Sequence, residues 1–357
     1  MSAVFCVDTA LLAIPSYAED EIQAENIILK LKEWSDVASN LGRNRVARSS
    51  TAELDLGALG FFPGLKNVED LINFSGLKGV YDAKTVWSTY NNILNRAGIL
   101  EELSGVDVCK YRDVELKPDL LDGLAPFDLR KLSESMLVAI GFSNYLSGSS
   151  NFLFAGASDE RCESVDFCAW IEEAQGLNCA SIPTHAKSKI SVVTRLPDVM
   201  NSVKSDELWK SSTISSDFYF AISIRAMEIL KSSGKDPSFY DVPRFVLGSE
   251  FIQSIRNHGG FGDSQFSGTI LDCCARVVLG NPKEPLKPFG RPKQMVRDRD
   301  SAKALRSHIT STKVGLRLMV WMKACGTVEI ANVGPKFEVM IEYGDDDGSY
   351  TVSYGRN

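Results

Sequence analysis

The sequence predicts an α/β domain over residues 1–160, a mixed, helix-rich region over residues 161–280 and an α+β module over residues 281–357. In the first region short apolar runs alternate with segments of helical period, which is typical of a short parallel sheet covered by helices. In the last region short alternating runs are separated by turns, which favours an antiparallel meander.

The first domain begins with an expected strand over Ala3–Val7, an apolar run that ends at Asp8. A helical period follows from Ala18 to about Asn40. A second strand is expected over Arg43–Arg48, before the helix N-cap signal Ser50-Thr51. The other elements of this domain are expected at Asn67–Phe74, Ala83–Arg96 and Phe127–Leu146, all helices, and in the strand NFLFAGAS that starts at Asn151.

The two later regions continue this series of expected elements. Helices are expected at Asp166–Ala174, Pro197–Lys210, Phe218–Lys231 and Thr269–Val278, and a strand at Lys189–Val193. RDRDSAKALRSH is expected to form a helix, because Arg299, Lys303 and Arg306 lie at i, i+4 and i+7. The final strands are expected at Leu316–Lys323, Thr327–Val333, Phe337–Glu342 and Tyr350–Val352.

The composition, with 44% hydrophobic and 24% charged residues, is that of a globular protein. It excludes a disordered chain, a collagen-like repeat and a disulfide-stapled miniprotein. No run approaches the roughly 20 apolar residues of a membrane span. The N-terminus lacks the basic region of a signal peptide and has Asp8 inside its apolar run. The eight cysteines are expected to be free thiols in a reducing compartment, which predicts a cytoplasmic protein without a membrane partner.

Charge is concentrated in one stretch. Lys283–Lys323 holds 11 basic and three acidic residues, a local charge of +8 in a chain whose net charge is −7. On the expected strand Arg317, Trp321 and Lys323 share a face, which suits phosphate contact and base stacking. The predicted nucleic-acid-binding residues are Arg297, Arg299, Lys303, Arg306, Arg317, Trp321 and Lys323. The alternatives are a solvated, half-buried strand beside a basic linker, or an acidic partner within the chain.

Two acids follow the first two expected strands. Asp8 closes the first, and Glu53 comes just after the second. Because ligands bind at the carboxyl ends of strands in open α/β sheets, these carboxylates are predicted to hold Mg²⁺ or Mn²⁺. Such a metal activates water for phosphodiester hydrolysis. The alternative is that Asp8 only caps the end of its strand.

The segments FCVDTALL, STAEL and the long apolar helix before NFLFAGAS resemble a PIN-type ribonuclease domain over about 160 residues. The resemblance implies that Asp8 and Glu53 are metal ligands and that Asp128 or Glu134, near the start of the long helix, is a further catalytic acid. The sequence departs from the pattern by a large insert between residues 60 and 120. The same scaffold without catalysis is therefore the alternative.

The last 70 or so residues are similar in outline to the RelE/ParE-type toxin fold, in which side chains on the sheet hold RNA phosphates or contact a target protein. That similarity implies contacts by Arg306, His308, Arg317 and Lys323. Together the resemblances imply a metal-dependent nuclease, or a toxin-like nuclease subunit of a prokaryotic antiviral defence system with partner subunits. The alternative is a non-catalytic assembly or sensor subunit that binds nucleic acid or a protein partner through its basic C-terminal region.

Four potential zinc ligands occur close together in the middle region: Cys162, Cys168, Cys179 and His185. Structural zinc sites generally use ligand pairs spaced by two to four residues, and these spacings are wider. Buried thiols are therefore expected here in place of a zinc site.

Overall fold

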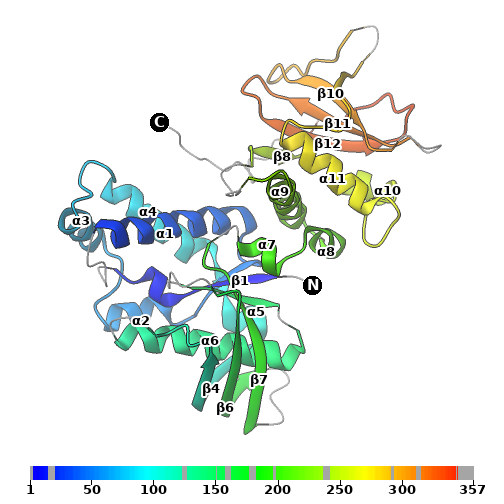
Figure 1. Cartoon of the computed structure of the whole chain (residues 1–357). Helices are drawn as coiled ribbons and strands as arrows, with labels where there is room; N and C mark the ends of the chain where they lie inside the picture. The colour runs from blue at the N-terminus through cyan, green and yellow to red at the C-terminus, as the bar shows by residue number, and fades with distance from the viewer. Residues whose placement is uncertain are drawn as a thin grey trace. The chain divides into compact units, whose positions relative to one another are not determined.

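The structure, a computed structural model, describes residues 3–14, 21–122, 127–149, 151–156, 162–176, 182–195, 198–235, 242–290, 293–310, 315–342 and 344. The chain divides into two compact units, an N-terminal unit (Ser2–Ser202) and a C-terminal unit (Val203–Asn357). The first contains a largely parallel sheet with helices, and the second a largely antiparallel sheet (Figure 1). The mixed α/β class is as predicted, and the boundary between the two compact units follows residue 202.

The N-terminal unit is built on a seven-stranded sheet of order β3-β2-β1-β5-β7-β6-β4. Its strands are β1 (Val4–Val7), β2 (Val46–Arg48), β3 (Gly98–Ile99), β4 (Val106–Lys117), β5 (Phe152–Ala155), β6 (Ser164–Gly176) and β7 (Thr184–Val192). Its helices are η1 (Thr9–Leu12), α1 (Glu21–Leu41), α2 (Ala52–Ala58), α3 (Leu65–Phe74), α4 (Ala83–Arg96), α5 (Leu100–Ser104), α6 (Phe127–Ser147) and α7 (Val199–Ser202).

Strands β3, β2, β1, β5 and β7 pair in parallel with their neighbours. Strand β6 pairs antiparallel with β7, and β4 pairs antiparallel with β6 at the edge of the sheet. The chain leaves β1 toward β2 on one side and later adds β5 on the other, so the strand order reverses beside β1. In open parallel sheets the carboxyl ends of strands at such a reversal border a ligand-binding crevice.

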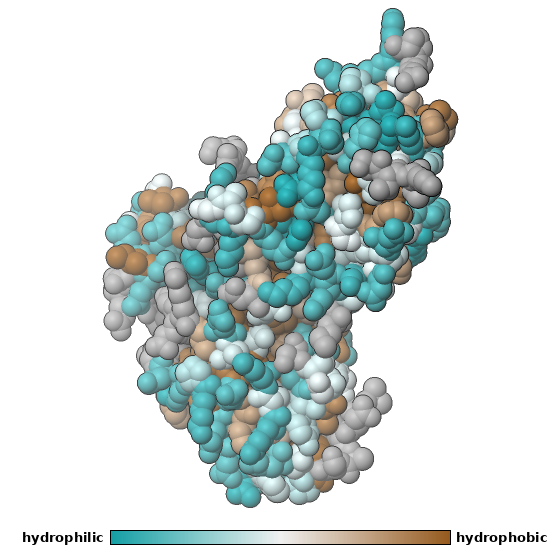
Figure 2. Space-filling model, turned by 45° about the vertical axis from the view of Figure 1, so that its right-hand side comes forward, coloured by the Kyte–Doolittle hydropathy of each residue, from teal (hydrophilic) through white to brown (hydrophobic). Residues whose placement is uncertain are grey.

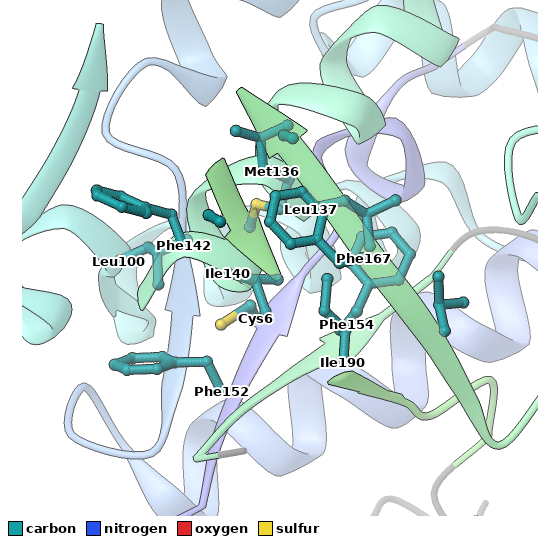
Figure 3. Close-up of a cluster of buried hydrophobic side chains, with 14 of the residues drawn as sticks. Cys6, Leu100, Met136, Leu137, Ile140, Phe142, Phe152, Phe154, Phe167 and Ile190 are labelled. Atoms are coloured by element: carbon teal, nitrogen blue, oxygen red, sulfur yellow. The ribbon is translucent and has the colours of Figure 1, made fainter. Parts of the chain in front are cut away.

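Helices cover both faces of the sheet at β1, and the side chains of β1 point alternately to the two faces. Cys6 faces α6 and joins a buried hydrophobic cluster in which Phe167 lies beside Leu137 (Figure 3). Phe5 points to the other face, where its ring centroid lies 5.7 Å from that of Trp34 on α1. Burial on both faces explains why the first strand is a continuous apolar run in the sequence.

Helix α6 lies close against the sheet at Gly141. A Cβ atom added there would lie 2.3 Å from Cδ1 of the buried Phe167 ring. The hydroxyl of Ser188 on β7 donates a hydrogen bond to the Gly141 carbonyl at 2.7 Å. The absence of a side chain at this position therefore lets the helix backbone lie against the sheet.

The C-terminal unit holds a five-stranded sheet of order β8-β12-β11-β10-β9. The strands are β8 (Phe245–Leu247), β9 (Lys287–Pro288), β10 (Lys303–His308), β11 (Arg317–Met322) and β12 (Val328–Gly334), and the helices are α8 (Ser205–Ser211), α9 (Ser215–Ser232), α10 (Phe251–Asn257) and α11 (Ser267–Val278). All neighbours pair antiparallel except β12 and β8, which are parallel. Helix α11 packs against α9 and contacts β10, β11 and β12.

Two segments that were predicted to be helices are strands. The expected helix over Asp166–Ala174 is β6, and the expected basic helix in RDRDSAKALRSH is β10 preceded by turns. Pairing along two neighbours outweighs local helix propensity in both cases. The expected strand over Phe337–Glu342 has no regular secondary structure, and the one over Tyr350–Val352 lies outside the described residues.

None of the helices in the described part of the chain combines the length and apolar composition needed to cross a membrane. On the face shown in Figure 2, hydrophobic residues form small areas among hydrophilic ones. Among the large hydrophobic side chains that the structure describes, the most exposed is Phe337 of the C-terminal unit, at 84%.

Candidate functional site

Asp8 directly follows β1 at the carboxyl edge of the sheet, as predicted, but its side chain is fully buried. The Ser133 hydroxyl of α6 lies 2.8 and 2.9 Å from the two carboxylate oxygens and donates to this carboxylate. The backbone N–H of Ala10 donates to Oδ1 at 3.1 Å, so Asp8 also caps η1. These bonds match the strand-cap alternative for Asp8.

The other predicted acids lie in different surroundings. Glu53, in the first turn of α2, forms an ion pair with Arg48 at 2.7 Å, and its side chain is 50% exposed. Asp128 is exposed in the first turn of α6. Within the described ranges, no group of three or more His, Cys, Asp and Glu side chains is arranged to hold a metal ion. Asp8 and Glu53 are thus held by different partners, and the Mg²⁺ or Mn²⁺ site with Asp8, Glu53 and Asp128 stays a prediction.

Replacing Asp8 with alanine is expected to destabilise the N-terminal unit by about 1–3 kcal/mol, because the buried Ser133 hydroxyl and the Ala10 N–H lose their acceptor. Urea unfolding combined with hydrogen exchange of peptides from β1 and α6 measures this effect. Glu53→Gln serves as the control, since a half-exposed ion pair contributes only about 0–1 kcal/mol. Equal stability of the Asp8 and Glu53 variants would contradict a structural role for Asp8.

A polar pocket of about 270 Å³ lies at this carboxyl edge. It is bordered by Thr9 after β1, residues 49–51 after β2 and Glu101 after β3, with Asp55 and Asp107 adding carboxylates. Glu101 accepts hydrogen bonds from the Ser49 hydroxyl and the Ser50 backbone N–H, at 3.2 and 3.0 Å. The edge is thus acidic, but sequence reasoning missed these acids. Glu101 could have been predicted as a site residue from its position just after the short strand β3. The sequence analysis did not predict that strand.

Of the potential zinc ligands, the structure brings Cys168 and His185 together on β6 and β7, with Sγ 3.6 Å from Nε2. Cys168 lies on a strand and not on the inner face of a helix. The Cys162 thiol donates to the Ser164 carbonyl at 3.0 Å, and Cys179 lies outside the described residues. Two side chains alone do not complete a tetrahedral zinc site.

Several basic residues predicted to bind nucleic acid are neutralised inside the C-terminal unit. Arg297 is fully buried, and its guanidinium donates to both carboxylate oxygens of Glu329, at 2.8 and 2.7 Å, and to Asp300, at 3.0 and 2.7 Å. Arg299 and Lys323 also approach Glu329, at 3.8 and 4.0 Å. For Arg297, Arg299 and Lys323 the structure therefore shows an acidic partner within the chain, which was one of the alternatives to nucleic-acid binding.

The charge network shifts the pKa values of Arg297 and Asp300. The hydrogen bond from Arg297 lowers the pKa of Asp300 to about 2. Burial acts to lower the pKa of Arg297, but hydrogen bonds to Glu329 and Asp300 outweigh it and raise that pKa. Arg297 and Asp300 therefore both carry their charge at neutral pH. Lys303, the next predicted residue along the chain, is exposed at the start of β10.

Trp321 is buried and not exposed for stacking. The alternation of β11 does place it on the face of Arg317, as predicted, but only 1% of its surface is exposed. Its indole N–H donates to the Glu342 carbonyl at 2.8 Å, and Phe289 and Ile341 pack in the same cluster. The chain that follows β12 covers this end of the sheet, so Trp321 belongs to the core.

The other end of this sheet face holds a pocket of about 450 Å³, here called the arginine pocket, with Arg306 of β10 and Arg317 of β11 in its wall. Arg317 is only 9% exposed. In both side chains Nε is buried and has no hydrogen-bond partner, and neither guanidinium forms an ion pair with any described residue. Arg306 is half-buried. Two neighbouring guanidinium groups whose Nε atoms are buried and unpaired are costly unless an anion binds them.

The surroundings of the two arginines are electropositive. Burial lowers the pKa of Arg317, and the charge of Arg306 lowers it further. Burial also lowers the pKa of His308, with Arg317 and Lys287 contributing. Lys336 adds a cation to the pocket wall. Glu338 is the acid of the wall, and its Oε1 accepts the backbone N–H groups of Val339 and Met340, both at 2.9 Å.

Comparison of the chain with protein-family models, curated proteins and solved structures found no match. The indications of function therefore come from the residues of the two pockets. Of the predicted basic residues, the structure brings Arg306 and Arg317 together in one pocket. Sequence reasoning missed Lys336 and Phe337, which line the same pocket from beyond the basic stretch.

Proposed function

We propose that this protein is a non-catalytic nucleic-acid-binding subunit that holds a phosphate of its ligand in the arginine pocket. The observation that carries the proposal is the pair Arg306 and Arg317, which line one pocket. Their Nε atoms are buried without a hydrogen-bond partner, and neither residue forms an ion pair with a described acid. Guanidinium groups bind phosphate oxygens through directed pairs of N–H donors, which is why arginine is common at phosphate sites.

The size and composition of the pocket support this proposal. A volume of about 450 Å³ falls in the range of small-molecule and cofactor sites and suits one nucleotide unit. Phe289 and Met295 give the wall an apolar part, while Arg306, Arg317 and Lys336 supply cations. A site with both properties suits a ligand that carries a charged phosphate beside a less polar group.

Binding without hydrolysis is preferred to the nuclease hypothesis because of the predicted acids. Asp8 is fully buried and bonded to Ser133, and Glu53 is paired with Arg48. These positions support a structural role for both carboxylates. The PIN-like and RelE-like resemblances remain hypotheses about the two scaffolds.

The central test measures the affinity of the full chain for short, labelled single-stranded RNA and DNA by fluorescence anisotropy. Arg317→Met is expected to weaken binding roughly 10- to 100-fold, the loss expected for a charged hydrogen-bonded contact. It should also reduce the slope of log affinity against log salt by about 0.7–1, because one phosphate contact is lost. Arg306→Met should behave in the same way.

A stability measurement separates a binding role from a structural one. A structural arginine destabilises the fold when it is removed, whereas removing an unpaired buried cation should be neutral or stabilising, by up to about 2 kcal/mol. Lys231→Gln, an exposed lysine at the end of α9, is the matched control for charge and should change neither property. Unchanged affinity in both arginine variants would overturn the proposal.

Incubating the protein with the same strands and Mn²⁺ tests the non-catalytic part of the proposal. Intact substrate is expected for the wild-type chain and for Asp8→Asn. Cleavage by the wild-type chain that is lost in Asp8→Asn would restore the nuclease hypothesis.

A further inference from the structure

Phe337 stands out beside the arginine pocket because its aromatic ring is 84% exposed and still lines the pocket. It lies in the segment that follows β12, together with Val339 and Met340, which are 77% and 64% exposed. Isolated exposed hydrophobic residues are ordinary, but three within four residues at the rim of a cationic pocket form a local apolar surface.

We infer that the arginine pocket selects single-stranded nucleic acid, holding one phosphate on Arg306 and Arg317 while the neighbouring unpaired base stacks on Phe337. This inference rests on the proposed function and names the class of ligand. A base can stack on a protein side chain when it is unpaired and not stacked inside a duplex. An exposed aromatic ring beside a phosphate site therefore favours single-stranded over double-stranded nucleic acid.

The charge around the ring agrees with this arrangement. The ammonium of Lys336 lies 5.7 Å from the Phe337 ring centroid, so a cation accompanies the aromatic face. Arg306 and Arg317 lie in the same pocket wall as this ring. Alternating cations and an aromatic face are the combination that proteins use to follow a single strand. Phe337 thus takes the stacking role that the sequence analysis gave to Trp321.

The backbone holds the segment in place at both of its ends. Gly334 ends β12, where an added Cβ would lie 2.8 Å from Cγ of Glu338, so the chain turns tightly there. At the other end the Glu342 carbonyl accepts the Trp321 indole N–H at 2.8 Å. The exposed ring is therefore carried by a short segment that is tied to the sheet on both sides.

The experiment compares binding of one labelled strand as a single strand, as a duplex with its complement and as an abasic strand with the same phosphates. The wild-type chain is expected to bind the single strand at least 10-fold more tightly than the other two. Phe337→Leu should weaken single-strand binding roughly 5- to 100-fold, the measured range for one stacked base, and leave abasic-strand binding unchanged. Phe337→Trp should keep the single-strand preference. Because the ring is exposed, neither variant should impair folding.

Different outcomes separate the failure of this inference from the failure of the proposed function. Equal binding of all three ligands, or equal loss of abasic and normal strands in Phe337→Leu, would overturn the stacking inference. If Arg317→Met still weakened binding of all three ligands in that case, the phosphate role of the pocket would stand. If Arg317→Met had no effect on any ligand, both would fall.

Discussion

Replacing Arg297 with methionine is expected to destabilise the C-terminal unit by about 3–5 kcal/mol, the usual cost of removing one partner of a buried ion pair. Arg297 and Glu329 are both fully buried and share two hydrogen bonds of 2.8 and 2.7 Å. The Glu329 carboxylate, which is 0% exposed, loses its closest cation in this variant. The urea-unfolding midpoint and hydrogen exchange of peptides from β10–β12 measure the loss.

A control and a double variant make this prediction specific. Arg299→Met removes a cation that is 33% exposed and 3.8 Å from Glu329, and should cost less than about 1 kcal/mol. Arg297→Met combined with Glu329→Leu should be more stable than Arg297→Met alone, because no charge is then left buried without a partner. If the double variant were the less stable of the two, the explanation by uncompensated charge would be wrong.

Replacing Gly141 with valine is expected to cost about 3 kcal/mol, the upper part of the usual range for an overpacked core. A Cβ at this position already lies within 2.3–2.6 Å of the Phe167 ring, and valine adds two further methyl groups. Either the ring or the whole of α6 must move away from the sheet, which exposes the cluster in Figure 3. Hydrogen exchange across α6 and β6 should report this loosening directly.

Gly57→Val in α2 is the matched control, because an added Cβ there meets no other atom within 4 Å and the backbone is helical. It tests helix propensity without overpacking and should change stability by less than about 1 kcal/mol. A second variant, Gly141→Val with Phe167→Ala, should recover part of the loss by making room. No recovery would indicate that the contact of α6 with Ser188, and not the ring, limits the site.

The fold could be predicted from the sequence where the apolar pattern was strong. The buried run of β1 and the helical period of α6 are confirmed within a few residues. β6 was mistaken for a helix although Val165, Phe167 and Ala169 alternate with exposed or half-buried residues, because helix-forming residues follow them. β4 was missed, since an edge strand carries charges such as Arg112, which pairs with Glu172 of β6 at 2.8 Å.

The candidate site was harder to predict, because charge in a sequence does not show which cations are neutralised. The basic stretch was recognised correctly as a compositional feature, but the partner of Arg297 is Glu329, 32 residues further along the chain. Arg306 and Arg317 differ from Arg297 in forming no ion pair with a described acid after folding. In the same way, the burial of Trp321 depends on the later segment that covers it.

The internal neutralisation of the basic stretch has a kinetic consequence for a ligand of the arginine pocket. Arg297, Arg299 and Lys323 are gathered around Glu329, and the whole chain has a net charge of −7. The positive charge of the arginine pocket is therefore local and belongs to a molecule that is negative as a whole. If the pocket binds a nucleic acid as proposed, we expect little long-range steering of this polyanion and association at the ordinary rate for proteins. Under the proposed function, differences in affinity between ligands would then come mainly from the rate at which the bound strand dissociates.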